Sequence, residues 1–185
     1  MKLSNLSFTA MLVAVAGSAM LAQAPPAKTP PAVATAEIKG EGIAGTLTLS
    51  ERKQGTGTLV EYTVQVKGLK PGMHGVHFHA IGKCEPDFTA AGGHFDPGPA
   101  GNTDPDANHP FHMGDIPNLE VGANGTGTLK GVTTRVTLAD GPLSIFDADG
   151  TAIIVHGNPD QGITGEPKSG VSGGPRVACG VINKK

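Results

Sequence analysis

The spacing of the histidines is the most informative feature of this chain. All seven lie between residues 74 and 156 of a sequence of 185 residues. His77 and His79 form a His-x-His pair, and a second group places possible ligands three residues apart, at His109, His112 and Asp115. Imidazole is the commonest metal ligand in proteins, and imidazole with carboxylate suits zinc and copper. The sequence therefore predicts a domain built around metal.

The His77-Phe78-His79 segment has the pattern of a β-strand. Successive side chains of a strand point to opposite faces, so both imidazoles share one face while Val76 and Phe78 point toward the core. Two further histidines, His94 and His156, stand alone in glycine-bounded segments. Taken by itself, a His-x-His pair also fits two surface histidines, so its context has to decide between the two interpretations.

The composition limits the classes of partner. The formal net charge is −2, and the charged residues form neither a basic patch for nucleic acid nor a membrane-surface signature. The chain has 28 glycines, one tyrosine and no tryptophan, so a metal or a disulfide would support a core that is poor in aromatic side chains.

The first 24 residues have the features of a secretory signal peptide. They contain one basic residue, Lys2, then an apolar run and a small-residue end at 22–24. A membrane anchor is the alternative, but the apolar run is short and rich in Ser, Gly and Ala. Residues 25–36 are rich in Pro and Ala and read as an extended linker. We therefore expect an exported domain over residues 37–185, in the periplasm or the medium, with no membrane contact after cleavage.

The chain has only two cysteines, Cys84 and Cys179. An even number of cysteines in an exported protein predicts a disulfide, because the compartment is oxidising, whereas two free thiols are the alternative. Such a bridge would close a long loop in a domain that has few other large stabilising side chains.

Strand patterns dominate the rest of the chain. Period-2 alternation or short runs rich in Val, Ile and Thr occur at 46–50, 60–66, 127–137, 152–155 and 177–182, with Gly and Pro turn signals between them. They predict an antiparallel all-β domain. Two long stretches, 81–124 and 157–175, lack periodicity. Loops of this length inside a compact domain are usually functional, and these two contain or follow the histidines.

Five segments in the same order resemble the copper/zinc superoxide dismutases. The first, 72–84, is similar to the metal-binding strand of that family, and the others match its bridging histidine, its zinc histidine and aspartate, its last copper ligand, and its arginine with the second cysteine. These other segments are 91–97, 112–115, 153–156 and 174–180. The resemblance extends from about residue 36 to 183, and it implies a flattened eight-stranded Greek-key β-barrel with copper and zinc as cofactors.

The resemblance also implies the ligands of both metals. Copper would be bound by four histidines: His77, His79, His94 and His156. Zinc would be bound by His94, His112, Asp115 and one more histidine. His94 would lie between the two ions as an imidazolate, one ring nitrogen to each, which two flanking cations make favourable.

The fourth zinc ligand departs from the family pattern. Relatives have a histidine about midway between the residues that match His94 and His112, and here residues 97–108 contain none. His109, three residues before His112, is the only candidate histidine. The alternatives are a degenerate zinc site with His109 at the surface, or Asp104 or Asp106 in the vacant ligand position.

Four more residues gain a role from the resemblance. His74 would brace the site through hydrogen bonds to the backbone, and Asp160 would link the two metal sites through ligand histidines, although an Asp in a glycine-rich loop also fits a solvated turn. Arg176, three residues before Cys179, would steer and orient a small anion beside copper. Lys168 in the same loop could assist.

The activity implied by the resemblance is disproportionation of superoxide to oxygen and hydrogen peroxide, with His94 and Arg176 as the catalytic side chains. A non-enzymatic copper-binding or copper-delivery domain is the alternative, which loss of a copper histidine or of the arginine would favour. A zinc hydrolase would require a general base close to the metal, and no Glu adjoins these histidines. The sequence leaves open whether the protein is a monomer or a homodimer.

Overall fold

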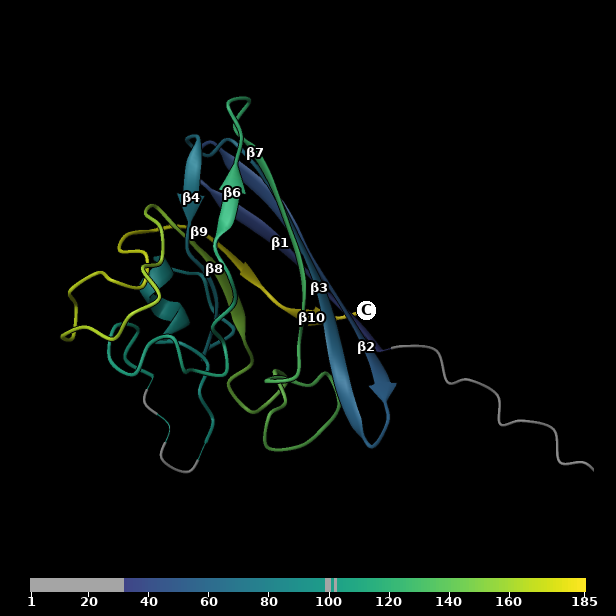
Figure 1. Cartoon of the computed structure of the whole chain (residues 1–185). Coiled ribbons are helices and arrows are strands. Elements are labelled where there is room, and N and C mark those ends of the chain that lie inside the picture. The colour runs from purple at the N-terminus through teal and green to yellow at the C-terminus, as the bar shows by residue number, and fades with distance from the viewer. Residues whose placement is uncertain (1–31, 99–100, 102) are drawn as a thin grey trace, which may run out of the picture.

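The structure, a computed structural model, describes residues 32–98, 101 and 103–185. The predicted signal peptide lies outside the described residues. Within them the chain forms ten strands and one short 3-10 helix, η1 (Figure 1). The elements are β1 (Ala32–Gly40), β2 (Ile43–Gln54), β3 (Gly57–Lys67), β4 (Gly72–His74), β5 (Val76–His79), η1 (Phe88–Ala91), β6 (Leu119–Val121), β7 (Thr126–Thr133), β8 (Ala152–His156), β9 (Arg176–Val181) and β10 (Asn183–Lys184).

The strands form one antiparallel sheet that curls into a barrel. Its order is β4-β6-β7-β3-β2-β1-β9-β8-β5, so the path starts and ends on two strands that only Gly75 separates in sequence. Two junctions of the sheet have a single residue pair each, the one between β6 and β7 and the one between β1 and β9. Since β4 and β5 are two halves of one interrupted strand and β10 is a two-residue addition beside β1, eight strands build the barrel. The prediction of an eight-stranded Greek-key barrel is confirmed.

The barrel interior is filled by the apolar side chains that alternate along the strands, as the sequence predicted. In β3, Val60, Tyr62, Val64 and Val66 are buried in one core cluster while the residues between them point outward. Phe78 of β5 belongs to the same cluster and is fully buried. Full burial of an aliphatic or aromatic side chain contributes about 1.5–3 kcal/mol, so these faces hold the strands in register.

A second, smaller cluster lies on the other face of β8. Ala152 and Ile154 of β8 pack there with Ala91 of η1 and with Cys179, while Cys84 and Phe88 cover them. Cys84 and Cys179 form the predicted disulfide, with Cα atoms 5.8 Å apart. The loop that follows β5 is therefore fastened to β9 both by apolar packing and by a covalent bond.

The long loops gather on one side of the barrel. In Figure 1 the described parts of the first loop (residues 81–118), in teal, and the second loop (residues 157–175), in yellow-green to yellow, lie on the side of β8 that faces away from the long β2 and β3 hairpin. No helix among the described residues is long and apolar enough to span a membrane.

Two predicted boundaries were wrong. Residues 32–36 of the linker predicted over 25–36 belong instead to β1, in which Ala34 and Ala36 are buried in the core, while residues 25–31 lie outside the described residues. Every residue of β1 pairs with β2, so these small alanines are enclosed by neighbouring strands. In the sequence alone, a stretch rich in Pro and Ala looks like a linker.

The strand predicted over 127–137 ends at Thr133. After Thr133 the chain leaves the sheet, and the backbone N–H of Leu138 donates to the buried carboxylate of Glu51 instead of to a backbone carbonyl of a neighbouring strand.

The disulfide generates a first prediction. The two cysteines are 95 residues apart, and closing a loop of that length stabilises a fold by about 4–5 kcal/mol in the chain-entropy description. Replacing both, as Cys84→Ala with Cys179→Ala, should lower the free energy of unfolding of the metal-free protein by several kcal/mol. Denaturant titration measures this, and a loss below about 1 kcal/mol would show that packing alone fastens the loop.

Candidate metal centre

Strand β5 is the scaffold of the site, and it is flanked on both edges. On one edge His77 pairs with Ile154 of β8 and His79 pairs with Ala152. On the other edge the first loop takes the place of a strand: the N–H of Phe78 donates to the carbonyl of Gly114 at 3.0 Å, and its carbonyl accepts from the N–H of Phe95 at 2.9 Å. This pairing brings side chains that are far apart in sequence onto one face.

Gly114 shows why the loop can approach so closely. A Cβ at this position would lie 2.3 Å from the carbonyl oxygen of Phe78 and 3.1 Å from the Cβ of Phe95. Only glycine fits between these two segments. The glycine in His112-Met-Gly-Asp115 therefore allows the adjacent Asp115 to reach β5, where it forms an isolated bridge with His77.

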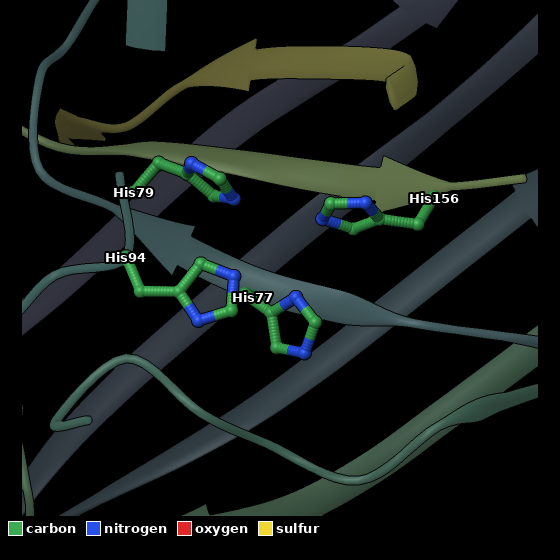
Figure 2. Close-up of side chains that lie close together, drawn as sticks. All are labelled: His77, His79, His94 and His156. Atoms are coloured by element: carbon green, nitrogen blue, oxygen red, sulfur yellow. The ribbon is translucent and has the colours of Figure 1, made fainter. Parts of the chain in front are cut away.

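Four histidines converge above this face. His77, His79, His94 and His156 are all buried, and each offers a ring nitrogen within 4.8 Å of the others. Figure 2 shows the four rings turned toward one another, from β5, from β8 and from the first loop. The ring centroid of His94 lies 4.2 Å from that of His77 and 4.9 Å from that of His79. The alternative of two surface histidines at 77 and 79 is therefore wrong.

The nitrogens that face the centre of this group have no hydrogen-bond partner. They are Nδ1 of His77 and Nε2 of His79, His94 and His156. Burial of a polar atom without a partner costs free energy, and such atoms are rare in folded proteins. Four of them at one point fit a metal ion that accepts their lone pairs.

The opposite nitrogens of these rings are held in place. His77 Nε2 donates to Asp160 at 2.9 Å, and His79 Nδ1 donates to the carbonyl of Gly92 at 3.1 Å. His156 Nδ1 donates to the carbonyl of Gly174 at 3.0 Å. A donated proton on one nitrogen leaves the lone pair on the other, so these contacts fix both the tautomer and the ring orientation.

Burial keeps these imidazoles neutral. Desolvation lowers the pKa of His77 and of His94 to about 4 and the pKa of His156 to about 3, and it holds the pKa of His79 well below its usual value. The Asp115 and Asp160 carboxylates act in the opposite direction at His77, Asp115 does so at His94 and Asp160 at His156, but burial outweighs them. At neutral pH the four rings are therefore uncharged ligands whose lone pairs are free.

A second group surrounds the carboxylate of Asp115. His94 Nδ1 lies 2.7 Å from one of its oxygens, and Nδ1 of His112 and of His109 lie 3.0 and 3.3 Å from the other. Neighbouring ligand atoms of a tetrahedral zinc site, with bonds of about 2.0 Å, are about 3.3 Å apart. Three imidazole nitrogens therefore lie within 3.3 Å of one carboxylate, and together they make up the donor set of a closed four-ligand site.

A second set of four possible ligands is found when every pair of ligand atoms, and not only each histidine and Asp115, has to be close together. His77, His94, His109 and Asp115 offer ligand atoms within 4.8 Å of one another, and His112 is outside this set. However, the unpartnered Nδ1 of His77 faces the four-histidine group, and the other ring nitrogen, Nε2, donates to Asp160. We therefore assign His77 to the first group and His112, whose Nδ1 approaches Asp115, to the second.

His109 is buried within this second group. Its Nε2 donates to Asp160 at 2.7 Å, and no part of its side chain is exposed. Although burial opposes its charged form, the Asp115 and Asp160 carboxylates outweigh burial and raise the pKa of His109 to about 9. The surface position considered as an alternative for this residue is wrong, since the His-x-x-His spacing delivers both rings to one carboxylate.

Asp104 and Asp106 do not take the fourth position. Asp104 accepts hydrogen bonds from the N–H groups of Asp106 and Ala107, in a local turn. The carboxylate of Asp106 is directed toward the second loop and accepts from Gly170 and Ser172. Neither belongs to a group of side chains spaced for a metal ion.

Asp160 links the two groups. One of its oxygens accepts from His77 and the other from His109, so the carboxylate spans both ligand sets. Asn118 holds its backbone reciprocally: Nδ2 of Asn118 donates to the carbonyl of Asp160 and Oδ1 accepts its N–H, both at 2.8 Å. Asn118 could not be predicted from the sequence, because a single Asn that follows a proline in a loop carries no motif.

Arg176 lies beside the first group. Its guanidinium donates to the carbonyls of Phe88 at 2.7 Å and Gly92 at 2.6 Å. The Gly92 carbonyl also accepts from His79, so one peptide group positions both side chains. His74 braces the opposite side, with ring nitrogens 2.8 Å from the carbonyl of His156 and 2.9 Å from that of Lys70. Lys168 is exposed in the second loop.

Comparison with known proteins agrees with this geometry. The family model for copper/zinc superoxide dismutase (SODC) matches residues 43–182. A relative named superoxide dismutase [Cu-Zn] from Caulobacter vibrioides is 42% identical over 157 residues, covering 80% of this chain and 84% of the relative. Superoxide dismutase [Cu-Zn] 2 from Brassica juncea is 40% identical over 146 residues, covering 77% and 90%.

A solved structure shares the fold. The crystal structure of the clock protein EA4 superposes with a TM-score of 0.68 at 28% sequence identity, covering 86% of this chain and 99% of that one. The family match extends over most of the described barrel and includes both groups of histidines. By sequence, by fold and by the two ligand groups, this chain belongs to the copper/zinc superoxide dismutase family.

Proposed function

We propose that this protein is an oxidoreductase that disproportionates superoxide to oxygen and hydrogen peroxide, at a copper site supported by a histidine-bridged zinc site. The observation that carries the proposal is the position of His94. Its Nε2 faces the four-histidine group without a partner, while its Nδ1 lies 2.7 Å from Asp115 in the second group. One ring thus belongs to both ligand sets, which are those of the family.

The two sites differ in the ligands that the chain provides. His77, His79, His94 and His156 would bind copper, with imidazole ligands that suit either of its oxidation states. His94, His109, His112 and Asp115 would bind zinc. Three imidazoles and one carboxylate form the closed type of zinc site, whose role is structural.

The residues around the copper site supply protons and orientation. Copper held by these histidines would supply the redox chemistry, by passing an electron from one superoxide to the next. Each peroxide formed also takes up two protons. His94 could hold one of them at Nε2, the nitrogen that has no partner within the protein, whenever that nitrogen is not bound to copper, while Asp115 keeps the ring in place at Nδ1.

Arg176 gives the site its attraction for a small anion. Its guanidinium is half-buried, and two backbone carbonyls direct it toward the His79 side of the centre. A fixed positive charge beside the copper ligands draws superoxide in, and its planar shape orients a diatomic anion better than a lysine would.

Export also belongs to the proposal. The Cys84–Cys179 disulfide is compatible with an oxidising compartment, which agrees with the secretory signal predicted from the first 24 residues. We propose a periplasmic or extracellular protein on these grounds. Neither the sequence nor the comparisons decide between a monomer and a homodimer.

The function is tested by loading the purified protein with copper and zinc and measuring superoxide consumption. The expected result is rapid consumption that depends on copper, with about one copper and one zinc per chain by elemental analysis. His156→Ala removes a copper ligand and should abolish copper retention and activity together. A fully loaded protein that consumes no superoxide would favour copper delivery instead, and activity without copper would contradict the assignment.

The assignment of His109 generates a separate prediction. His109→Ala removes one of four zinc ligands but none of the copper ligands, so zinc affinity should fall by at least about 100-fold while copper is retained. Competition with a chromogenic zinc chelator measures this affinity. Unchanged zinc affinity would mean that a fourth ligand other than His109 completes the site.

Arg176 is tested through charge. Arg176→Ala should lower kcat/KM at low salt by about tenfold and flatten its dependence on ionic strength, because the steering charge is lost while copper remains bound. Arg52→Ala is the matched control, since Arg52 is exposed on β2 and pairs with Glu61, away from the metal ligands. If both variants show the same salt dependence as the unmodified protein, Arg176 does not steer the substrate.

A further inference from the structure

Asp106 is a buried carboxylate that binds none of the proposed metal ligands. It lies in the first loop, three residues before His109, and it is 3% exposed. One oxygen accepts from the N–H of Gly170 at 2.9 Å. The other accepts from Ser172 twice, from its N–H at 3.0 Å and from its hydroxyl at 2.8 Å. All three donors belong to the second loop.

The backbone around Asp106 reinforces this connection. The carbonyl of Asp106 accepts from the N–H of Gly165 at 2.9 Å, and the carbonyl of His109 accepts from the Thr164 hydroxyl at 2.6 Å. The second loop is therefore held at two places, 164–165 and 170–172, by a short part of the first loop. A carboxylate that accepts several hydrogen bonds has to be charged to use them fully, which suits a stable clamp.

The clamped segment leads directly to the copper site. Ser172 is followed by Gly173, where a Cβ would lie 2.7 Å from the Cβ of His156 and where φ is +109°, so the loop backbone packs against that histidine. The carbonyl of Gly174 then accepts from His156 Nδ1 at 3.0 Å. Arg176 follows two residues later, at the start of β9.

We propose that Asp106 is a positioning residue for the copper site, which holds residues 170–174 of the second loop against the first loop and thereby fixes the His156 ring and Arg176. The inference rests on the proposed function, because the parts that Asp106 positions are a proposed copper ligand and the proposed guiding arginine. It is distinct from the link through Asp160, which contacts the histidines directly.

The clamp is tested first by limited proteolysis of the copper- and zinc-loaded protein. Lys168 is exposed and lies two residues before Gly170, so trypsin cleavage after Lys168 reports how often the second loop leaves its site. Asp106→Ala removes the acceptor of three hydrogen bonds and should raise this cleavage rate by about tenfold or more. Asp106→Asn, which keeps one oxygen, should fall between this variant and the unmodified protein, and Ser172→Ala should have a smaller effect.

The second measurement reads the copper site itself. Electron paramagnetic resonance of the cupric protein should show changed hyperfine parameters in Asp106→Asn, because the Gly174 carbonyl no longer fixes His156. The same variant should lose part of the ionic-strength dependence that Arg176 confers. Asp140→Asn is the control: it removes the same charge from a fully exposed side chain near the C-terminus and should match the unmodified protein in every measurement.

Two results would overturn the inference. One is a Lys168 cleavage rate in both Asp106 variants within twofold of the unmodified protein. The other is faster cleavage with an unchanged cupric spectrum, which would make Asp106 a loop tether without influence on the copper site. Neither the cleavage rate nor the cupric spectrum depends on superoxide, so an inactive but metal-loaded protein would refute the proposed function and leave these two tests intact.

Discussion

The site depends on one constraint: buried imidazole nitrogens without hydrogen-bond partners are costly unless a metal ion binds them. Within the described part of the chain five such nitrogens face the two ligand groups, on His77, His79, His94, His109 and His156, while His112 approaches Asp115 through Nδ1 and leaves its Nε2 without a partner. Each would cost free energy in a protein interior, yet the barrel, the loops and several hydrogen bonds all act to bring them together. The arrangement is favourable only when cations take up the lone pairs. The folded chain is therefore built for metal, and metal binding should stabilise it.

Rigid and irregular parts contribute differently to this centre. Strands β5 and β8, locked by the barrel core, present His77, His79 and His156 from a surface that cannot shift by much. The loops add His94, His109, His112 and Asp115, and they need fastening because their backbones lack a ladder of their own. Pairing along the free edge of β5, the disulfide, and the carboxylates of Asp160 and Asp106 provide it. Each of these contacts holds a loop segment that contains or adjoins a proposed metal ligand.

The sequence predicted the barrel strands and most of the ligand groups, because both have short-range patterns. Alternation in β3 and the His-x-His of β5 depend only on the two-residue period of a strand. The role of Asp106 was missed, and Asn118 was not considered, since their partners lie 42 to 66 residues away in segments without periodicity. The start of β1 was missed for another reason: buried alanines in a Pro/Ala-rich stretch look like a linker until β2 is seen beside them. Placing His109 in the centre required the loop path as well as the spacing.

His94 is the residue on which the whole account turns, and its two nitrogens can be examined directly. The decisive measurement is a crystal structure of the oxidised protein loaded with both metals, with anomalous scattering recorded at the copper and zinc edges. Copper should lie about 2.0 Å from Nε2 of His94 and zinc about 2.0 Å from its Nδ1, on opposite sides of one ring. If either nitrogen has no metal within bonding distance while both sites are filled, the two groups of ligands are not joined through His94 and the account fails.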